Sequence, residues 1–290
     1  MRIFCHSEHH DLESGVIQND TPNENRSRKN RETMSKPICY LVLATPRSGS
    51  TLLGQGLQAS GLAGDPKEFF GHKMPFWMER WRTPALPAYA ARLSQVRATP
   101  NGVFGAKLLY RQLLHLESLA RQEPELTELP LPEILDRLFP SLHLVWVTRE
   151  DKVRQAISWF KARQTGVWGQ DQGQSAPKLG RAWRLGDEPL EPGELAFDYD
   201  GIAALVRQAE AEDAAIGQFF ATSGIEPFRV VYEEFAPRYE ETILALLRWL
   251  GVTPPPDLTL PNPRTVQLAD DRTDEWVARF NELHAAGAPG

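Results

Sequence analysis

Short apolar runs alternate with longer amphipathic segments along the chain from residue 39 onward. These runs are short and mostly apolar, as is typical of strands buried in a parallel sheet, and they predict strands at Cys39–Ala44, Val103–Lys107, Leu142–Thr148 and Phe228–Tyr232. Apolar residues at helical spacing predict helices at Leu52–Ser60, Leu113–Arg121, Val153–Arg163, Ile202–Phe220, Ile243–Leu250 and Thr273–His284. This alternation predicts a three-layer α/β domain in which helices flank a central, mainly parallel sheet.

Local signals mark where two of these helices begin or end. Asp200 is the expected N-cap of the helix over Ile202–Phe220, because a short acidic side chain accepts hydrogen bonds from the free N–H groups of a first turn. The helix over Ile243–Leu250 is expected to end at Gly251, which shortly precedes a run of prolines.

Two polar stretches lack any periodicity. Residues 1–36 are rich in Asn, Ser, Glu, Arg and His and hold too little apolar surface to offset the entropy of ordering. We therefore expect a disordered tail there, followed by a folded domain at 37–290. The stretch from Gly166 to Pro192 is rich in Gly, Gln, Asp and Pro, and a loop of that length inside a compact domain is usually a lid or a substrate-binding segment.

The bulk composition narrows the class of protein. The chain has 290 residues, of which 41% are hydrophobic and 24% are charged, which suits one main soluble domain with a sizeable core. A net charge of -6 argues against a general nucleic-acid binder, so any anion site must be local. No apolar run approaches the roughly 18 residues of a membrane span, and the start has no apolar signal core. With only two cysteines, Cys5 and Cys39, we expect a cytoplasmic protein without a disulfide framework.

The segment after the first predicted strand has the form of a phosphate-binding loop. The pattern G-x-x-x-x-G-K-[ST], which belongs between an apolar strand and an apolar helix, lies over Ala44-Thr45-Pro46-Arg47-Ser48-Gly49-Ser50-Thr51. Its first glycine is Ala44 and its lysine is Ser50. The second half of this run can still surround an anion with backbone N–H groups and side-chain donors. These donors come from Arg47, Ser48, Gly49, Ser50 and Thr51.

The missing lysine changes the anion that this loop is expected to bind. In triphosphate-binding loops the lysine reaches the β and γ phosphates. Arg47 instead offers a planar fork of donors inside the loop itself. This combination favours a single 5'-phosphate or phosphosulfate over a triphosphate with magnesium, and the alternative is an incidental strand-turn-helix with Ser and Gly in the turn.

Seven segments of the chain resemble one known family, in the same order. They are YLVLATPRSGSTLL, SGLAGDPKEFF, TPNGVFGAKLLY, VTRE to AISWF, QTGVW, GIEPFRVVYEEF and ADDRTDEWVARF, and they extend over residues 40–280. On these motifs the chain resembles the bacterial carbohydrate sulfotransferases of the trehalose 2-sulfotransferase type, which use 3'-phosphoadenosine-5'-phosphosulfate (PAPS). The resemblance implies the sulfotransferase fold, PAPS as sulfuryl donor, 3',5'-adenosine bisphosphate as product, and a hydroxyl of a small molecule or glycolipid as acceptor.

A second anion site is needed for the ribose 3'-phosphate of PAPS, which is nearly dianionic at neutral pH. The resemblance assigns this site to Arg149, which follows the predicted strand Leu142–Thr148, and to Ser158. The alternative for Arg149 is an ordinary surface pair with Asp151. The typical family member has a serine at the position of Arg154, so this arginine either adds a charge to the phosphate site or faces solvent.

The acceptor hydroxyl must lose its proton to a base within hydrogen-bond reach. Glu68 matches the general base of the family, and we expect the neighbouring Phe69 and Phe70 to lower the local dielectric and raise its basicity. Alternatively, Glu68 is a carboxylate in the first turn of a helix, where the helix dipole favours it. His72 is the reserve candidate for the base.

Sulfuryl transfer calls for cations that meet the charge on the transferring group, more than for a nucleophile. Arg47 is the first choice for this catalytic role and Lys107 is the second, with Gly105 permitting close approach of a backbone. The alternative for Lys107 is a solvated strand end. The scheme needs no metal, and the sequence has no cluster of His, Cys and Asp at metal-ligand spacing.

The late motif and one tryptophan add further candidates. In the family the segment ADDRTDEW packs near the nucleotide, so Arg272 is expected at the 3'-phosphate or over the adenine, unless it bridges to Asp271 or Asp274. Trp168 is the candidate for contact with a sugar acceptor, because it opens the long irregular loop and ligand pockets are commonly lined by aromatic side chains.

Two other functions remain open on sequence alone. One is a P-loop-like kinase, which is disfavoured because Arg149 follows the strand after which a magnesium-binding carboxylate would stand. The other is a non-catalytic nucleotide-binding protein, which would not need Glu68 alongside Arg47 and Arg149. Some members of the resembled family are dimers, which leaves a homodimer open, and neither nucleic acid nor a membrane span is expected.

Overall fold

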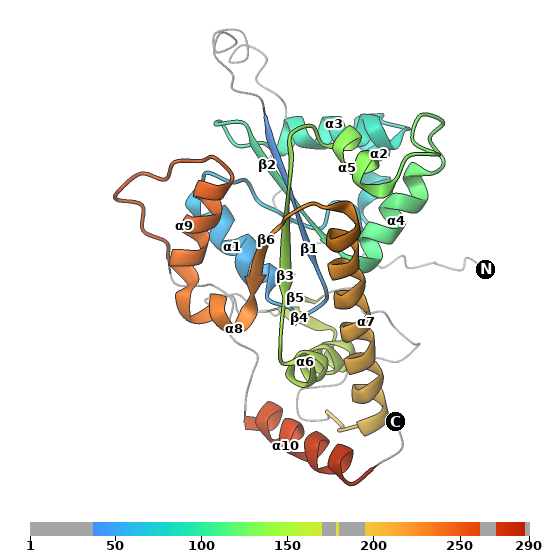
Figure 1. Ribbon diagram of the computed structural model, residues 1–290, viewed down its shortest axis with the longest axis vertical. Helices are drawn as coiled ribbons and strands as arrows, with labels where there is room; N and C mark the ends of the chain where they lie inside the picture. The colour runs from blue at the N-terminus through green and yellow to red at the C-terminus, as the bar shows by residue number, and fades with distance from the viewer. Residues whose placement is uncertain (1–36, 170–177, 180–194, 262–270, 288–290) are drawn as a thin grey trace, which may run out of the picture. The chain divides into compact units, whose positions relative to one another are not determined.

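The central sheet of the protein is parallel. The computed structural model describes residues 37–169, 178–179, 195–261 and 271–287, so the expected tail at 1–36 and most of the long loop lie outside it. The sheet has the order β2-β1-β3-β6, with bounds β1 Ile38–Ala44, β2 Val103–Leu109, β3 Leu142–Thr148 and β6 Phe228–Val231 (Figure 1). The predicted parallel sheet is confirmed, although the last strand ends one residue early because Tyr232 begins a helix.

Helices cover both faces of this sheet, because successive apolar residues of β1 point to opposite sides. Odd-numbered residues of β1 face one hydrophobic core and even-numbered residues face the other. The first core is closed by α2 (Met74–Trp81), α3 (Leu86–Arg97), α4 (Tyr110–Ala120), α5 (Leu131–Leu138) and the end of α7 (Tyr199–Ser223), and the second by α1 (Ser50–Ser60) and α9 (Tyr239–Trp249) (Figure 1). The three-layer α/β architecture is therefore confirmed. Among the helices described, none combines the length and apolar composition needed to cross a membrane.

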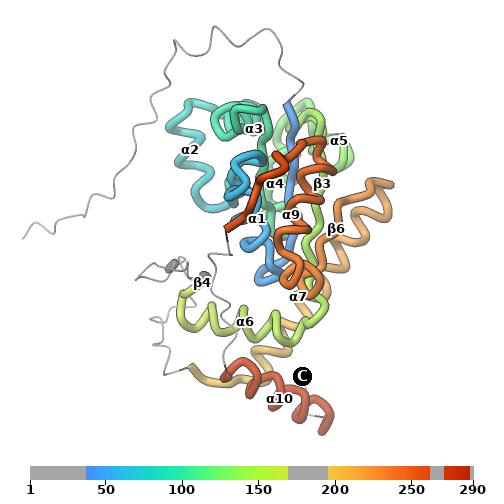
Figure 2. Tube along the Cα trace, turned by 90° about the vertical axis from the view of Figure 1, so that its left-hand side faces the viewer, coloured from blue at the N-terminus to red at the C-terminus, as the bar shows by residue number. Residues whose placement is uncertain are grey.

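A third, smaller core joins three helices below the sheet in Figure 1. It consists of apolar side chains from α6 (Lys152–Thr165), the first half of α7 and α10 (Asp271–Ala285). Helix α7 has 25 residues, which is long enough to pack on the sheet at one end and on α6 at the other (Figure 2). The short elements are β4 (Val167–Gly169), which pairs antiparallel with β5 (Lys178–Leu179), and α8 (Tyr232–Phe235) and η1 (Ala236–Arg238), which follow β6.

Some helix boundaries differ from those that the sequence predicted. Helix α7 begins at Tyr199 with Asp198 as N-cap, and Asp200 lies inside the first turn, so the predicted cap was wrong. An acidic side chain in a first turn still interacts favourably with the helix dipole. The sequence prediction also omitted α2, α3 and α5, which all carry proline in their first turn.

The carboxyl ends of β1 and β3 lie side by side in the middle of the sheet. The register pairs Ala44 with Val147, so the residues that follow the two strands emerge at the same edge. From β1 the chain first adds β2 on one side and later β3 on the other. Such a reversal of strand order creates the crevice in which open α/β sheets bind ligands. The loop after β1 and Arg149 after β3 both lie at this edge of the sheet, where a hydrogen bond joins them.

Candidate active site

The loop between β1 and α1 turns through two residues with positive φ angles, of which one is a glycine. Arg47 and Gly49 have positive φ angles of 63° and 98°, in the region that glycine tolerates best. A Cβ atom on Gly49 would lie 2.5 Å from Cδ2 of Tyr232, so a larger residue does not fit. The chain then enters α1 at Ser50, and the first N–H groups of a helix have no partner within the helix. The loop thus has the form of an anion site at a helix N-terminus.

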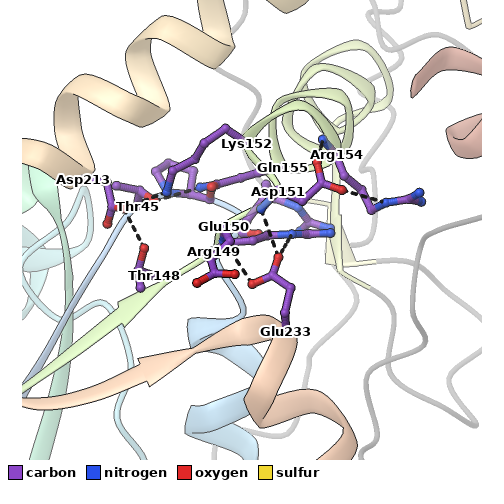
Figure 3. A network of polar contacts seen from close by, with 12 residues as sticks. Thr45, Thr148, Arg149, Glu150, Asp151, Lys152, Arg154, Gln155, Asp213 and Glu233 are labelled. Atoms are coloured by element: carbon purple, nitrogen blue, oxygen red, sulfur yellow. Dashed lines mark hydrogen bonds and ion pairs between the residues drawn. The ribbon is translucent and has the colours of Figure 1, made fainter. Parts of the chain in front are cut away.

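Gln155 of α6 anchors this loop. Its amide nitrogen donates to the hydroxyl of Thr45 at 2.8 Å and to the carbonyl oxygen of Pro46 at 2.7 Å. The side chain is fully buried, where hydrogen bonds shielded from water are stronger (Figure 3). Sequence analysis missed Gln155, because a glutamine in the first turns of a helix has no distinctive pattern until the loop and the helix meet.

Arg47, Ser158 and Arg149 come together beside the loop. Nε of Arg47 donates to Oγ of Ser158 at 2.9 Å, and its Nη1 donates to the carbonyl oxygen of Trp168 at 2.5 Å. Nη1 of Arg149 donates to the carbonyl oxygen of Arg47 at 3.3 Å. Both residues that the resemblance assigns to the 3'-phosphate therefore contact Arg47, whose guanidinium points towards α6 and β4.

The first residues of α8 hold Arg149 in place. The guanidinium carbon of Arg149 lies 4.5 Å from the centre of the Tyr232 ring, and its Nε lies 3.7 Å from Oε1 of Glu233. The same carboxylate accepts hydrogen bonds from the N–H groups of Glu150 and Asp151 at 3.0 and 3.2 Å (Figure 3). Arg149 thus forms its ion pair with Glu233 and not with Asp151, which was the alternative from sequence. The motif VVYEEF contains both α8 residues, but only the pairing of β6 with β3 shows that they meet Arg149.

The donor groups around the loop are cationic and incompletely satisfied. Burial, followed by the charge of Arg149, lowers the pKa of Arg47 to about 10. Burial also lowers the pKa of Arg149, against the opposing effect of Tyr232 and the nearby carboxylates. Oγ of Ser48 and Nε of Arg149 are buried and have no hydrogen-bond partner in the described part of the chain. Unused donors beside buried cations favour an anionic ligand.

Glu68 reaches the same edge of the sheet through the segment before α2. The carbonyl oxygen of Lys67 accepts the N–H of Lys107 at 2.9 Å, in a short parallel bridge to β2. This pairing places Glu68 beside Lys107, whose Nζ lies 3.0 Å from Oε1 of Glu68 and 3.2 Å from Oγ1 of Thr51. Nε2 of Gln112 donates to the other carboxylate oxygen, Oε2, at 2.8 Å. Lys107 therefore links the first turn of α1 to the Glu68 carboxylate.

The surroundings of Glu68 differ from the sequence-based expectation. Glu68 does not lie in a helix, so its interpretation as a first-turn carboxylate was wrong. Burial raises its pKa, but the charge of Lys107, hydrogen bonds from Lys107 and Gln112, and the charge of the exposed His72 together hold the pKa below its ordinary value. The expected rise in basicity beside the two phenylalanines was therefore wrong, because the donors outweigh the apolar neighbours. Glu68 is ionised at neutral pH.

Lys107 and Arg154 lie in surroundings that the sequence left open. Lys107 is only 8% exposed, so it is not a solvated strand end. Arg154 pairs with Asp274 of α10 at 2.6 Å and with Asp151 at 3.3 Å. These pairs tie α10 to the start of α6, and the contact of Arg154 with Asp151 can be followed in Figure 3. The charge of Arg154 also contributes to lowering the pKa of Arg149.

Arg272 and Trp168 are positioned by the small core below the sheet. Arg272 lies in the first turn of α10, which packs on α6. The ring of Trp168 packs against the same core, while its carbonyl oxygen accepts the hydrogen bond from Arg47. Across the ranges that the structure describes, no three His, Cys, Asp or Glu side chains gather as metal ligands.

The sequence and the fold agree with one enzyme family. The model of the Stf0 sulphotransferase family matches residues 39–282, and the chain belongs to this family. Two similar proteins are the trehalose 2-sulfotransferases of Mycolicibacterium smegmatis and Mycobacterium tuberculosis. The first is 30% identical over 270 residues, which cover 84% of this chain and 94% of that protein. The second is 31% identical over 277 residues, which cover 86% of this chain and 97% of that protein.

Proposed function

We propose that this protein transfers a sulfuryl group from PAPS to a hydroxyl of a carbohydrate or a glycosylated small molecule. The observation that carries the proposal is the hydrogen bond from Arg149 to the carbonyl oxygen of Arg47, which joins the arginine after β3 to the loop after β1. A donor with a phosphosulfate at one end and a ribose 3'-phosphate at the other needs two anion sites joined in this way. Membership of the sulphotransferase family supports the sulfuryl group as the unit transferred.

We assign the residues at this edge of the sheet to the two charged ends of PAPS. We assign the 5'-phosphosulfate to the loop and the first turn of α1, with donors from Arg47, Ser48, Gly49, Ser50 and Thr51. The buried hydroxyl of Ser48, which has no partner among the described residues, supports this assignment. We assign the 3'-phosphate to Arg149 and Ser158, with Arg272 of α10 as a further contributor. Arg47 connects the two groups, because it belongs to the loop and bonds Ser158.

Glu68 is the proposed base for the acceptor hydroxyl. In the transfer step the hydroxyl oxygen bonds to sulfur, the bond between sulfur and the 5'-phosphate oxygen breaks in line with it, and the proton passes to Glu68. The lowered pKa of Glu68 keeps the carboxylate ionised, which is the state that a base needs. Lys107 lies between this carboxylate and Thr51 of α1, where a cation can meet charge that develops on the transferring group.

The acceptor is proposed to be a sugar or a glycolipid. Both relatives are named as trehalose 2-sulfotransferases, which supports a sugar hydroxyl as the group that is sulfated. Trp168 of β4 is the proposed aromatic contact for this acceptor. Its carbonyl oxygen accepts a hydrogen bond from Arg47, so the residue lies next to the proposed donor site.

Incubation of the purified protein with sulfur-labelled PAPS and a panel of sugars, glycolipids and cell extract tests the proposal. We expect mass spectrometry to find a sulfated carbohydrate, and absence of label from the whole panel contradicts the function.

Thermal unfolding distinguishes a PAPS-dependent sulfotransferase from a kinase. We expect 3',5'-adenosine bisphosphate to raise Tm strongly and magnesium-ATP to change it little, because only a ligand of the folded state stabilises it. The reverse pattern favours the kinase.

A further inference from the structure

The Glu68 carboxylate is held at both of its oxygen atoms by residues from different elements. Lys107 of β2 contacts Oε1 at 3.0 Å, and Gln112 of α4 donates to Oε2 at 2.8 Å. The Glu68 side chain as a whole is still 38% exposed. The residue is therefore restrained in orientation without being sealed off.

A second hydrogen bond, separate from the one to Glu68, fixes the orientation of the Gln112 amide. Its Oε1 accepts the N–H of Leu109 at 3.0 Å, in the capping arrangement that starts α4. Because the amide oxygen is used at the helix N-terminus, the NH₂ end points towards Glu68. The segment after Glu68 also packs closely on this amide, since a Cβ atom on Gly71 would lie 3.2 Å from Nε2 of Gln112. Gln112 thus couples the start of α4 to the carboxylate.

We propose that Gln112 is a positioning residue of the reaction, which holds the Glu68 carboxylate in the orientation that accepts the proton of the acceptor. The inference rests on the proposed function, in which Glu68 is the base. Lys107 cannot replace Gln112 in this role, because it contacts the other oxygen and is shared with Thr51 of α1. Two donors on two oxygens prevent the carboxylate from rotating about its terminal bond.

This role has a consequence for the pH dependence of the reaction. The charged or polar groups that act on the Glu68 carboxylate are Lys107 of β2, Gln112 of α4 and His72 of its own segment, and together they lower its pKa. A base with a lowered pKa stays ionised to lower pH, so kcat/KM falls only when the pH drops through that folded-state pKa. Removal of the Gln112 donor raises the pKa, and the acidic limb of the profile then moves to higher pH.

Gln112→Glu is the sharpest test, because glutamate keeps an acceptor for the Leu109 N–H and removes the donor to Glu68. We expect the acidic limb of kcat/KM to move up by at least about one pH unit, since the variant loses a hydrogen bond to a charged group and places a second carboxylate beside Glu68, and both changes raise the pKa of Glu68. Gln122→Glu makes the same chemical change at an exposed position just after α4 and is expected to leave the limb in place. If the acidic limb of the kcat/KM profile lies at the same pH in Gln112→Glu as in the wild type, the inference is overturned, whatever happens to kcat.

A second variant and a direct titration distinguish positioning of Glu68 from a purely structural role of Gln112. Gln112→Met removes both hydrogen bonds without adding charge; it should lower Tm through loss of the α4 cap and still move the limb up. A lower Tm with an unmoved limb shows a purely structural role and overturns the inference. Carbon NMR of the Glu68 carboxyl in the ligand-free protein needs no turnover, so it tests Gln112 even if sulfuryl transfer fails. There too the titration must move to higher pH in Gln112→Glu, and an unchanged midpoint overturns the inference.

Discussion

The two halves of the candidate site differ in how completely their charges are matched. On the base side, Glu68 faces Lys107 at 3.0 Å and Gln112 at 2.8 Å, so the carboxylate has a partner at each oxygen. On the donor side, Arg47 and Arg149 are neighbouring cations, and Nε of Arg149 has no hydrogen-bond acceptor in the described ranges. The carboxylate of Glu233 is the counter-charge there, at 3.7 Å.

This difference indicates which half is completed by a ligand. Buried donors without acceptors cost free energy that an anion recovers on binding. A carboxylate that is already paired gains little from a further cation, and its ionised form is suited to receive a proton. We therefore expect substitutions on the base side to change turnover and substitutions on the donor side to change nucleotide affinity.

Glu68→Gln is expected to have the largest effect. Loss of a general base reduces kcat by roughly 10²–10⁴-fold, while the affinity for 3',5'-adenosine bisphosphate changes little because the donor side is intact. Steady-state kinetics and isothermal titration calorimetry measure the two quantities. Turnover that persists at the wild-type level removes Glu68 as the base, and an equal loss of nucleotide affinity shows that the two halves are not separate.

Arg149→Ala should weaken binding of the 3'-phosphate of the nucleotide far more than binding of the 5'-phosphate. Hydrogen bonds to charged groups are worth about 1.5–3 kcal/mol, so we expect roughly a 10–100-fold loss of affinity for 3',5'-adenosine bisphosphate. Adenosine 5'-phosphate, which lacks the 3'-phosphate, should lose far less. Arg248→Ala, on the exposed side of α9, is the matched control. Equal losses for both nucleotides exclude Arg149 from the 3'-phosphate site.

Gly49→Ala tests whether the backbone of the loop depends on glycine. The new Cβ atom would lie 2.5 Å from the Tyr232 ring at a φ angle of 98°, and we expect a loss of about 1–3 kcal/mol in the free energy of unfolding. Gly61→Ala is the control, because its φ angle is 69° and nothing lies within 4 Å of the new atom. Urea denaturation should show a larger loss for Gly49, together with weaker nucleotide binding. Similar losses for both variants show that the Tyr232 contact is unimportant.

Arg154→Ser should have the smallest effect. Its partners Asp274 and Asp151 are 69% and 41% exposed in their side chains, and exposed ion pairs are worth less than about 1 kcal/mol. We expect a small loss of stability that disappears in high salt, with unchanged affinity for 3',5'-adenosine bisphosphate. A loss of affinity as large as that of Arg149→Ala places Arg154 at the phosphate site and contradicts its pairing with Asp274 and Asp151.

Particular elements show how far the sequence could predict the structure. Strand β3 has the predicted bounds Leu142–Thr148, because a mostly apolar run of this length is what a central strand needs to contact the helices on both faces of the sheet. Helix α3 escaped prediction because it also carries apolar residues outside its buried face, such as Ala91 and the exposed Val96, so no single apolar stripe stands out in the sequence. Gln155 and Glu233 could not be assigned from sequence, since their partners lie on other elements, 110 and 83 residues away in the chain.

The sequence by itself determined the local features: the alternation of strands and helices, and the loop that holds Arg47 and Gly49, because backbone preferences and side-chain spacing act over a few residues. The tertiary structure alone decided which charges meet. Glu68 and Gln112 are 44 residues apart in the chain, and Arg47 and Ser158 are 111 apart. Such contacts arise only when parallel strands bring distant loops to one edge of the sheet. For that reason the pairing of Glu68, and with it the lowering of its pKa, could not be predicted from the residues beside it.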